Sequence, residues 1–549
     1  MVESANIAEA LRRQAEARPD GLALIVPIER VAGRWTDRRW NYRQLNDLSD
    51  RLAAGLQRRG IDPGTRVAFM VPPSPEFFAL FFALFKAGCV PVLIDPGIGL
   101  KPLKSCLGEA RPQTFIGVTR AQIARMLFGW GRGHIRRTVT IGRRPLPIGL
   151  RYADLLTDNA TDFVPPETDP EAMAAILFTS GSTGIPKGVV YRHRHFTAQV
   201  GLVRDTYSIR PGEVDLPTFP PFALFDPALG MTTVIPPMDF TRPADVDPEM
   251  LVGLIAQYRV TNLFGSPALM DTLSRHLASR SATLPTVRRA LSAGAPVSPT
   301  VVERLHAALV DAADLHTPYG ATECLPVATI AGRELLAGPA EANRRGQGIC
   351  VGRPLNVNRI RIIRITDQPI ARLADSTEVA RGAVGEICVA GPSVTDCYWQ
   401  RELHTRLAKM TDAEGVVWHR MGDLGWLDAE GRLWYCGRKS ERVVTVTGTL
   451  FTECVEGVVN AVHGVRRSAL VGVGPERGVP LVIVEPEPGQ RAAPLVSRVR
   501  DRLAGHEGTA AIEHVVVRRS LPVDIRHNAK IRRGQLADRM RLRYGRYSA

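Results

Sequence analysis

The segment at residues 178–189, FTSGSTGIPKGV, constrains the fold of this chain more than any other segment. It follows the apolar run MAAIL, which predicts a buried strand, so it leaves a strand end, where α/β proteins commonly hold phosphates. Its glycines let the backbone approach an anion, and its other residues add hydroxyl and ammonium donors: Thr179, Ser180, Gly181, Ser182, Thr183, Gly184 and Lys187. A Walker loop needs Gly-Lys-Ser/Thr, whereas this chain has Pro186-Lys187-Gly188. We therefore expect a nucleotide-phosphate loop of another type, with a flexible Ser/Gly turn as the alternative.

Length and composition indicate a folded enzyme of at least two domains. A chain of 549 residues exceeds what one core usually supports, and 45% hydrophobic with 23% charged residues is typical of a globular protein. The eight cysteines include no Cys-x-x-Cys pair, which predicts neither a zinc site nor a disulfide framework and fits a reducing cytoplasm.

The N-terminus lacks the apolar core of a secretory signal. Residues 77–94 are apolar but interrupted by Lys86, Gly88 and Pro91, so we expect a helix and a strand there, not a transmembrane span.

The charge balance predicts anionic partners. The net charge of +15 and the pI near 9.8 fit nucleic acid, a membrane surface or phosphorylated small molecules. Two basic stretches, residues 125–151 and 526–546, lie in no recognisable nucleic-acid module, so we expect solvated faces there and no nucleic-acid partner. A basic scaffold that binds nucleic acid or an anionic membrane is the alternative from a different class of protein. The first stretch could also dock a partner or a hydrophobic-substrate carrier.

The order of apolar segments predicts an α/β fold with a boundary near Arg438. Up to about residue 150, and again from residue 174, strand patterns such as RVAFMV alternate with helical patterns such as QLNDLSDRLAAGLQRRG. A strand-rich portion follows, with NRIRIIRI and VGEICVAG, and the alternation restarts after Arg438. The C-terminal unit of about 110 residues is within the normal size range of a domain.

Further segments have side chains suited to a nucleotide. The run Tyr319, Gly320, Ala321, Thr322, Glu323 combines a ring that can stack on a base with a carboxylate that can hold magnesium; a helix N-cap at Thr322 is an equal alternative. Asp423 could accept hydrogen bonds from a ribose diol, and Arg438 could reach a phosphate or ribose; the alternatives are a turn aspartate and an interdomain ion pair. Small residues after a predicted strand would let a ligand lie against the backbone: Ala293, Gly294, Ala295 and Pro296.

Taken in order, the motifs TSGSTGIPKG, SAGAP, YGATE, GDLGWLD, GR and HNAKIRR resemble those of the adenylate-forming superfamily of acyl-CoA synthetases, luciferases and adenylation domains. The resemblance covers nearly the whole chain. It implies a large N-terminal α/β domain, residues 1–437, which binds ATP and the acyl substrate. A hinge at residues 438–441 would join it to a small mobile α+β lid, residues 442–549, that carries the catalytic lysine.

The resemblance also implies roles for single residues. The loop from Thr179 to Lys187 would hold the β and γ phosphates of ATP, and Tyr319 would stack on adenine. Glu323 with Thr322 would hold Mg²⁺. Asp423 would bind the ribose hydroxyls with Arg438 close by, and Lys530 would bridge the carboxylate and the α-phosphate, which repel each other. Ala529 stands where the usual motif has glycine, which restricts the loop slightly.

A departure from the superfamily pattern narrows the resemblance. Acyl-CoA synthetases usually have Pro-x-Phe-His in the acyl-site segment, whereas this chain has Pro220-Pro221-Phe222-Ala223. The strings TFPPFALFDPALGMTTVIPPMDFTRPA and PVDIRHNAKIRR resemble the β-lactone synthetases of bacterial long-chain olefin biosynthesis. That family implies a 2-alkyl-3-hydroxyalkanoic acid substrate and partner enzymes of the same pathway, a thiolase, a reductase and a β-lactone decarboxylase. The expected substrate pocket comprises Phe222, Ala223, Phe225, Gly265 and Ser266.

The implied chemistry needs no second substrate. ATP would convert the carboxylate into an acyl adenylate, and the substrate's own β-hydroxyl would then attack the carbonyl carbon and expel AMP. The sequence names two candidates for the base, His193 and His195. The expected catalytic residues are Lys530, Glu323, Lys187 and His193. A fatty acyl-CoA ligase or a fatty acyl-AMP ligase is the alternative enzyme.

Overall fold

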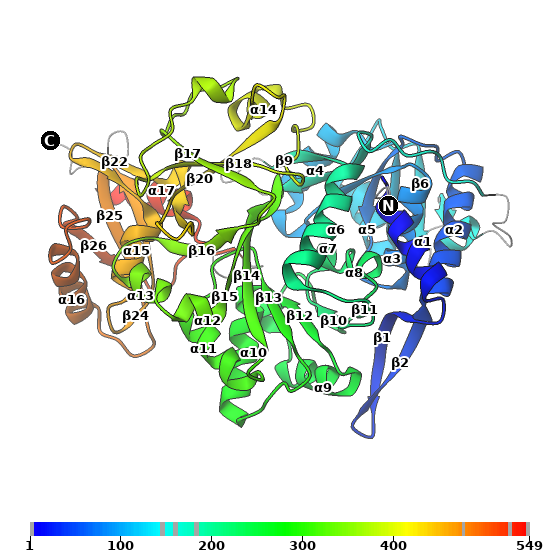
Figure 1. Ribbon diagram of the computed structural model, residues 1–549, viewed down its shortest axis with the longest axis horizontal. Helices are drawn as coiled ribbons and strands as arrows, with labels where there is room; N and C mark the ends of the chain where they lie inside the picture. Colours follow the sequence, from blue (N-terminus) through cyan, green and yellow to red (C-terminus); the bar gives the residue numbers. More distant parts are fainter. Residues whose placement is uncertain are drawn as a thin grey trace.

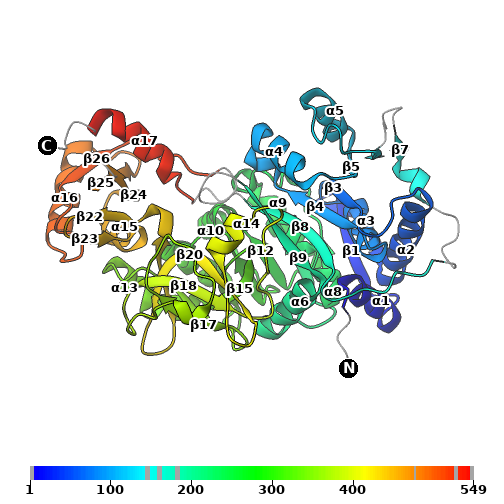
Figure 2. The same ribbon diagram turned by 90° about the horizontal axis from the view of Figure 1, so that it is seen from above.

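The structure is a computed structural model of the chain. It describes these ranges: 5–142, 149–156, 163–179, 186–474, 478–524 and 530–544. Figures 1 and 2 show an elongated molecule in which the strands form two large sheets and a smaller C-terminal group. The expected α/β class is therefore confirmed.

A seven-stranded sheet contains the strand that precedes the phosphate loop. Its order is β7-β6-β5-β3-β4-β8-β9, parallel apart from the antiparallel pair β8 and β9. The strands are β3 (Arg66–Met70), β4 (Val90–Ile94), β5 (Thr114–Val118), β6 (Arg137–Ile141), β7 (Leu150–Arg151), β8 (Met173–Thr179) and β9 (Lys187–Arg192). The helices between them are α3 (Pro75–Lys86), α4 (Leu100–Ala110) and α5 (Thr119–Phe128).

The second sheet has the order β17-β18-β20-β21-β16-β15-β14-β13-β12-β10-β11-β1-β2, with β19 paired to β20. Its first half comprises β1 (Leu22–Val31), β2 (Arg34–Asn41), β10 (Val214–Pro217), β11 (Thr232–Val234), β12 (Asn262–Gly265), β13 (Arg289–Ser292) and β14 (Asp314–Ala321). Its second half comprises β15 (Cys324–Ala331), β16 (Ile349–Pro354), β17 (Arg359–Ile363), β18 (Gly385–Ala390), β19 (Lys409–Thr411), β20 (Val417–Leu427) and β21 (Leu433–Arg438).

Helices accompany the second sheet and the N-terminal segment. They are α1 (Ile7–Ala17), α2 (Tyr42–Arg58), α6 (His193–Tyr207), α7 (Pro220–Ala223), α8 (Asp226–Leu229), α9 (Pro248–Tyr258), α10 (Pro267–Arg280), α11 (Pro299–Ala308), α12 (Gly332–Leu336), α13 (Pro339–Arg344) and α14 (Glu402–Ala408). Because β10, β12, β13 and the start of β14 are parallel, their carboxyl ends meet at one edge, where α/β folds bind ligands.

The chain leaves the large sheet at Arg438 through a short 3₁₀ turn, η5 (Lys439–Glu441). After this turn it forms the hairpin β22 (Val443–Thr445) and β23 (Gly448–Leu450), and a three-stranded sheet with three helices, seen at the left of Figure 1. These elements are β24 (Val465–Val473), β25 (Val479–Pro486), β26 (His514–Val517), α15 (Thr452–Asn460), α16 (Ala492–Ala504) and α17 (Arg533–Tyr544). The expected small C-terminal α+β unit is present, and the hinge at residues 438–441 stays a prediction.

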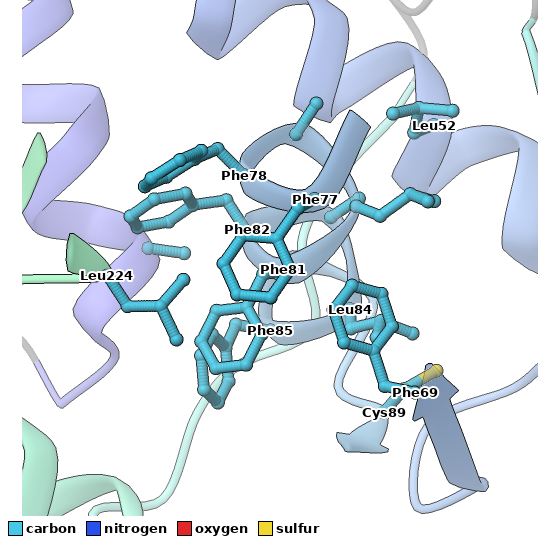
Figure 3. Close-up of a cluster of buried hydrophobic side chains, with 14 of the residues drawn as sticks. Leu52, Phe69, Phe77, Phe78, Phe81, Phe82, Leu84, Phe85, Cys89 and Leu224 are labelled. Carbon is cyan, nitrogen blue, oxygen red and sulfur yellow. The ribbon is translucent and has the colours of Figure 1, made fainter. Parts of the chain in front are cut away.

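Helix α3 is the centre of the largest hydrophobic core. Ser74 caps its first turn by accepting a hydrogen bond from the Phe77 backbone N–H, and Pro75 occupies the first turn, where no N–H is needed. Five of its side chains gather in Figure 3: Phe77, Phe78, Phe81, Phe82 and Phe85. A helix that is apolar on all sides is buried in a core or a membrane. In the part of the chain that the structure describes, no helix is both long and apolar enough to cross a bilayer.

Replacing Phe82 with alanine tests this core. Phe82 is fully buried, so Phe82→Ala should destabilise the protein by about 3–5 kcal/mol, through lost burial and the cavity left behind. Thermal unfolding measures the effect. Leu403→Ala is the control, since Leu403 is 56% exposed and its truncation should change the melting temperature little. Equal effects of the two substitutions would contradict the assigned core.

Candidate nucleotide site

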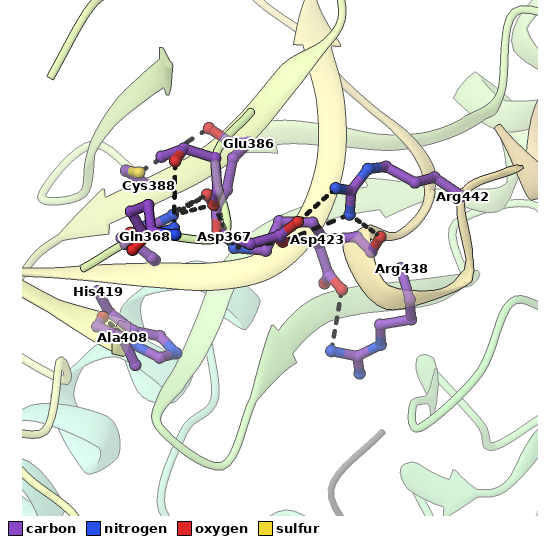
Figure 4. A network of polar contacts seen from close by, with 12 residues as sticks. Asp367, Gln368, Glu386, Cys388, Ala408, His419, Asp423, Arg438 and Arg442 are labelled. Carbon is purple, nitrogen blue, oxygen red and sulfur yellow. Dashed lines mark hydrogen bonds and ion pairs between the residues drawn. The ribbon is translucent and has the colours of Figure 1, made fainter. Parts of the chain in front are cut away.

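An ion pair between the buried Asp423 and the half-buried Arg438 lies at the centre of the candidate site. The two residues face each other across the antiparallel strands β20 and β21, and Arg438 Nη1 lies 2.9 Å from Asp423 Oδ1 (Figure 4). Burial raises the pKa of Asp423, and the Arg438 charge opposes that shift. Tyr319, at the end of β14, donates a hydrogen bond of 2.6 Å to Asp423 Oδ2. Three strands thus fix one carboxylate.

The Asp423 carboxylate still has acceptor capacity. Its Oδ1 atom is buried and receives no aligned hydrogen bond from the described residues, although Arg438 is close. A buried acceptor without a donor is costly, so a ligand hydroxyl at this position would be stabilising. The ring of Tyr435 lies 6.1 Å from that of Tyr319, which adds a second aromatic side chain beside the same carboxylate. This arrangement suits a ribose next to a flat base.

The segment from Tyr319 to Glu323 is the turn of a β-hairpin. Ala321 at the end of β14 pairs with Cys324 at the start of β15, so the alternative of a helix N-cap at Thr322 is wrong. Gly320 is required here because a Cβ atom would lie 2.7 Å from the Cys324 carbonyl oxygen. The tight turn leaves Thr322 and Glu323 at the strand edge, and Tyr191 holds the turn by donating to the Thr322 carbonyl at 2.6 Å.

Glu323 is held from two directions. Its Oε1 atom accepts a hydrogen bond of 2.6 Å from the Tyr398 hydroxyl. Its backbone carbonyl accepts hydrogen bonds from the N–H and the hydroxyl of Thr395, at 2.9 and 3.0 Å. Behind Thr395, the buried ammonium group of Lys409 donates to the Thr395 carbonyl. Burial lowers the pKa of Lys409 to about 8, while the Glu323 charge opposes that shift. These contacts orient the carboxylate and leave its second oxygen available.

Lys187 lies beside this carboxylate. It starts β9 and pairs in register with Thr179 at the end of β8, so the two ends of the phosphate loop are adjacent. Its Nζ atom lies 5.0 Å from the ring centre of Tyr398, a cation–π contact. Burial lowers the pKa of Lys187, and the charge of Glu323 opposes the shift. The loop residues expected to touch phosphate lie outside the described residues: Ser180, Gly181, Ser182, Thr183 and Gly184.

The SAGAP segment follows β13 at the same sheet edge. Gly294 has φ +97°, a conformation that favours glycine. Ser292, the last residue of β13, has a buried hydroxyl with no hydrogen-bond partner among the described residues. Of the expected backbone-contact residues, Ala293 and Ala295 are half-buried, whereas Gly294 and Pro296 are exposed. The segment can therefore border a ligand without a side chain in the way.

The expected acyl-pocket residues lie around the ends of β10 and β12. The ring of Phe222 stacks on that of Phe264, with 4.1 Å between their centres. Ala223 is buried and Phe225 packs at the edge of the main core. Gly265 ends β12, and the Ser266 hydroxyl accepts from the Leu269 N–H as the N-cap of α10. Ser266 therefore has a structural role as a helix cap, and the aromatic residues form an apolar wall.

The two candidate bases have different surroundings. His193 is buried with its ring 5.9 Å from Phe85, and burial lowers its pKa to about 4. Among the described residues, no contact joins His193 to Glu323, Lys187 or Asp423, which favours a structural role for its imidazole. The Nδ1 atom of His195 accepts a hydrogen bond from the Arg192 N–H at 2.9 Å, so His195 is committed to capping α6.

Lys530 lies at the edge of the site, in the C-terminal part of the chain. Its backbone N–H donates to Asp524 Oδ1, and the Asp524 N–H donates back to the Lys530 carbonyl, each at 3.0 Å. The Lys530 charge is close enough to act on the pKa of Asp423, which burial mainly raises. The structure thus brings the expected lysine into electrostatic range of the Asp423 carboxylate.

The described residues contain no group of three or more His, Cys, Asp or Glu side chains that could hold a metal by themselves. A single carboxylate, Glu323, fits a cation held mainly by the phosphates of a nucleotide, because Mg²⁺ usually keeps one or two protein carboxylates plus substrate phosphates. The residues present therefore fit Mg²⁺ as a companion of a nucleotide.

Comparison with known proteins agrees with this geometry. Residues 11–399 match the model of a family described as AMP-binding enzyme. The chain belongs to this family, whose members use ATP to activate an acid, and the expected adenylate-forming class is confirmed. An O-succinylbenzoate coenzyme A synthetase from Bacillus subtilis, solved with ATP and magnesium, has the same fold, with a TM-score of 0.75, 21% identity, and coverage of 96% of this chain and 98% of that one.

Two relatives are similar over nearly their whole length. An olefin beta-lactone synthetase from Stenotrophomonas maltophilia is 51% identical over 542 residues, 97% of each chain. One from Xanthomonas campestris pv. campestris is 51% identical over 548 residues, 98% of each chain. The narrower resemblance seen in the sequence is thereby confirmed.

Several residues of the site could not be recognised from sequence. Tyr398, Thr395 and Lys409 hold Glu323, yet each lies more than seventy positions away along the chain. Tyr435 on β21 lies beside Tyr319 on β14, although β16 and β15 stand between these two strands in the sheet. The only sequence signal was the aromatic Tyr398-Trp399 pair between two glycine-rich motifs.

Substituting Tyr398 tests the support of Glu323. Tyr398→Phe keeps the ring beside Lys187 and removes only the hydrogen bond to a charged group, which should raise the KM for magnesium-ATP by about tenfold. Pyrophosphate release at varied ATP measures this. Tyr207→Phe, which removes a hydroxyl bonded to Thr329 at 3.1 Å, is the matched control. An unchanged KM in Tyr398→Phe would show that the bond does not orient the carboxylate.

The low pKa of Lys409 predicts a pH effect on stability. Lysine in an unfolded chain titrates near pH 10.4, so between pH about 8 and 10.4 the unfolded state binds more protons and the free energy of unfolding rises with pH. Lys409→Met lacks this titration. The stability of the wild type relative to the variant should therefore increase by about 3 kcal/mol across this range, measured by urea unfolding. A difference that does not vary with pH would contradict the shifted pKa.

Proposed function

We propose that this protein is an ATP-dependent β-lactone synthetase that acts on a long-chain 2-alkyl-3-hydroxyalkanoic acid. The relatives that are 51% identical over nearly the whole chain carry the proposal. The replacement of the histidine of acyl-CoA synthetases by the buried Ala223 supports it, since a coenzyme A ligase would be expected to keep that histidine. We assign this reaction to the biosynthesis of long-chain olefins.

The first step is adenylation of the acid. A carboxylate oxygen of the substrate attacks the α-phosphorus of ATP, and pyrophosphate leaves. Both reacting groups are anionic, so the ammonium groups of Lys530 and Lys187 lower their repulsion. Asp423 accepts hydrogen bonds from the ribose hydroxyls, and Tyr319 with Gly320 and Ala321 borders the adenine. Glu323 and Thr322, together with the phosphates, would hold Mg²⁺, which would neutralise part of the phosphate charge.

The second step is ring closure. The β-hydroxyl oxygen attacks the acyl carbon, its proton leaves, and the bond to AMP breaks, which yields a four-membered lactone. Nucleophile and electrophile belong to one molecule, so holding them at attack distance supplies much of the rate enhancement. The aromatic wall of Phe222 and Phe225 would hold the alkyl chains. His193 packs beside Phe85, which favours a structural role, so we assign no residue as the base for this step.

The domain movement, the partner enzymes and the cellular compartment are also proposals. We place the hinge at residues 438–441, with a lid from residue 442 onward that moves between the two steps. The partners are the reductase and the β-lactone decarboxylase that precede and follow this reaction.

All eight cysteines are unpaired thiols, which supports a reducing compartment, the cytoplasm.

Product analysis without coenzyme A tests the reaction class. The protein, magnesium-ATP and a synthetic 2-alkyl-3-hydroxy acid are incubated, and the organic product is followed by proton NMR. We expect lactone ring-proton signals with one AMP per lactone. A thioester that forms only after coenzyme A is added would make the protein a fatty acyl-CoA ligase, and a released acyl adenylate would make it an acyl-AMP ligase.

Replacement of Lys530 tests the adenylation step. Lys530→Ala should slow pyrophosphate release by roughly a hundredfold or more, because a cation at the reacting anions is lost. The melting temperature should not change, since the Lys530 side chain is exposed. Arg280→Ala, at an exposed cation at the end of α10, is the control. Unchanged pyrophosphate release in Lys530→Ala would remove this residue from the catalytic set.

A further inference from the structure

Helix α5 exposes several large apolar side chains to solvent. Its buried side carries Gln122, whose amide donates to the Val139 carbonyl at 3.0 Å. Four large apolar side chains point outward instead, and they are 41–75% exposed: Ile123, Met126, Leu127 and Phe128. Apolar groups clustered on one exposed face usually mark a binding surface. In Figure 2, α5 stands at the periphery of the molecule, beside α4, where it is free to meet a large flat partner.

Cations border this apolar face, and the stretch of sequence that contains α5 has no acidic residue. From residue 110 to residue 153 the sequence has nine arginines and no Asp or Glu. Arg120 lies one turn before Ile123 on the same side of α5, and Lys101 and Lys104 are exposed on α4. An apolar helix face bordered by Arg and Lys is the pattern of helices that lie in the interface of an anionic membrane.

An arginine-lined groove lies next to α5. It has a volume of about 420 Å³ and its lining includes Arg59, Arg125, Arg136 and Arg137. No ion pair joins these four guanidinium groups to a carboxylate among the described residues. Among the described residues, Arg59 donates to the Asp154 carbonyl at 3.2 Å, and Arg125 donates to Gln122 Oε1 at 3.1 Å and lies over the ring of Phe115. A groove of this kind can hold the phosphate of a lipid headgroup.

We propose that the outer face of α5, with the adjoining arginine groove, docks the protein on a membrane that contains anionic lipids. The apolar side chains would enter the headgroup region, and the arginines would pair with lipid phosphates. A protein partner fits less well, because a specific protein interface would normally place polar or acidic groups among the cations. The proposal does not depend on the lactone chemistry, since binding can be measured without turnover.

Vesicle co-sedimentation of the full-length protein tests this proposal. We expect binding to vesicles of phosphatidylcholine with phosphatidylglycerol, loss of binding at high salt, and much weaker binding to phosphatidylcholine alone. The Leu127→Glu variant, which places a carboxylate in the apolar face, should reduce binding by roughly tenfold or more. Leu403→Glu is the matched control, because Leu403 is also an exposed leucine, 56% exposed, on another helix.

Further measurements make each outcome decisive. Arg136→Gln with Arg137→Gln should weaken binding to the anionic vesicles only, and all variants should keep their melting temperature and their ATP turnover on a short-chain acid. Equal binding of Leu127→Glu and wild type would overturn the proposal. So would displacement of the protein from vesicles by millimolar inorganic phosphate, which would indicate a site for soluble anions. If no vesicles bind and Leu127→Glu instead dissociates a dimer in sedimentation velocity, the face is an interface between two copies.

Discussion

The pair of Asp423 and Arg438 is the interaction on which the rest of the site depends. A carboxylate at this depth is stable only if a charge or donors compensate for the lost water. Arg438 supplies the charge and the Tyr319 hydroxyl supplies a donor, from two other strands. Because the compensation leaves one oxygen without an aligned donor, the same burial that stabilises the pair also prepares a binding position for a hydroxyl. Stability and ligand recognition thus share one set of contacts.

The pair also stands where the chain passes into its C-terminal part. Directly after Arg438, Lys439 donates to Glu386 Oε1 at 2.9 Å, and the buried Arg420 binds the other oxygen of Glu386 at 2.6 Å. On the far side of the turn, Glu441 pairs at 2.9 Å with Arg533, three residues beyond Lys530. Charged contacts therefore connect the Asp423–Arg438 pair, through η5, with the segment that contains Lys530. The proposed hinge at residues 438–441 lies among these pairs.

The sequence predicted those features that are encoded locally. Glycine and small residues after apolar runs indicated the loop and strand ends, because a strand end and a close backbone approach require such residues at fixed positions. The contacts of Tyr398 and Thr395 with Glu323, and of Lys409 with Thr395, were not predictable, since they arise only when segments far apart in the chain fold together. The hairpin turn at Thr322 was ambiguous for the related reason that a Gly-Ala-Thr-Glu run suits either a helix cap or a tight turn. Here the pairing of β14 with β15 decides it.

Charge distribution links the site to the surface. The proposed reaction brings together two anions, and two cations of the site, Lys187 and Arg438, each lie beside one carboxylate, Glu323 and Asp423. The site itself therefore accounts for little of the net charge of +15. Much of the excess lies instead in the acid-free stretch around α5, where apolar side chains share the same surface. Water stabilises exposed arginine but not exposed leucine or phenylalanine, whereas an anionic bilayer interface stabilises both the cationic and the apolar side chains. The proposed substrate, which has two alkyl chains, would collect at the same interface.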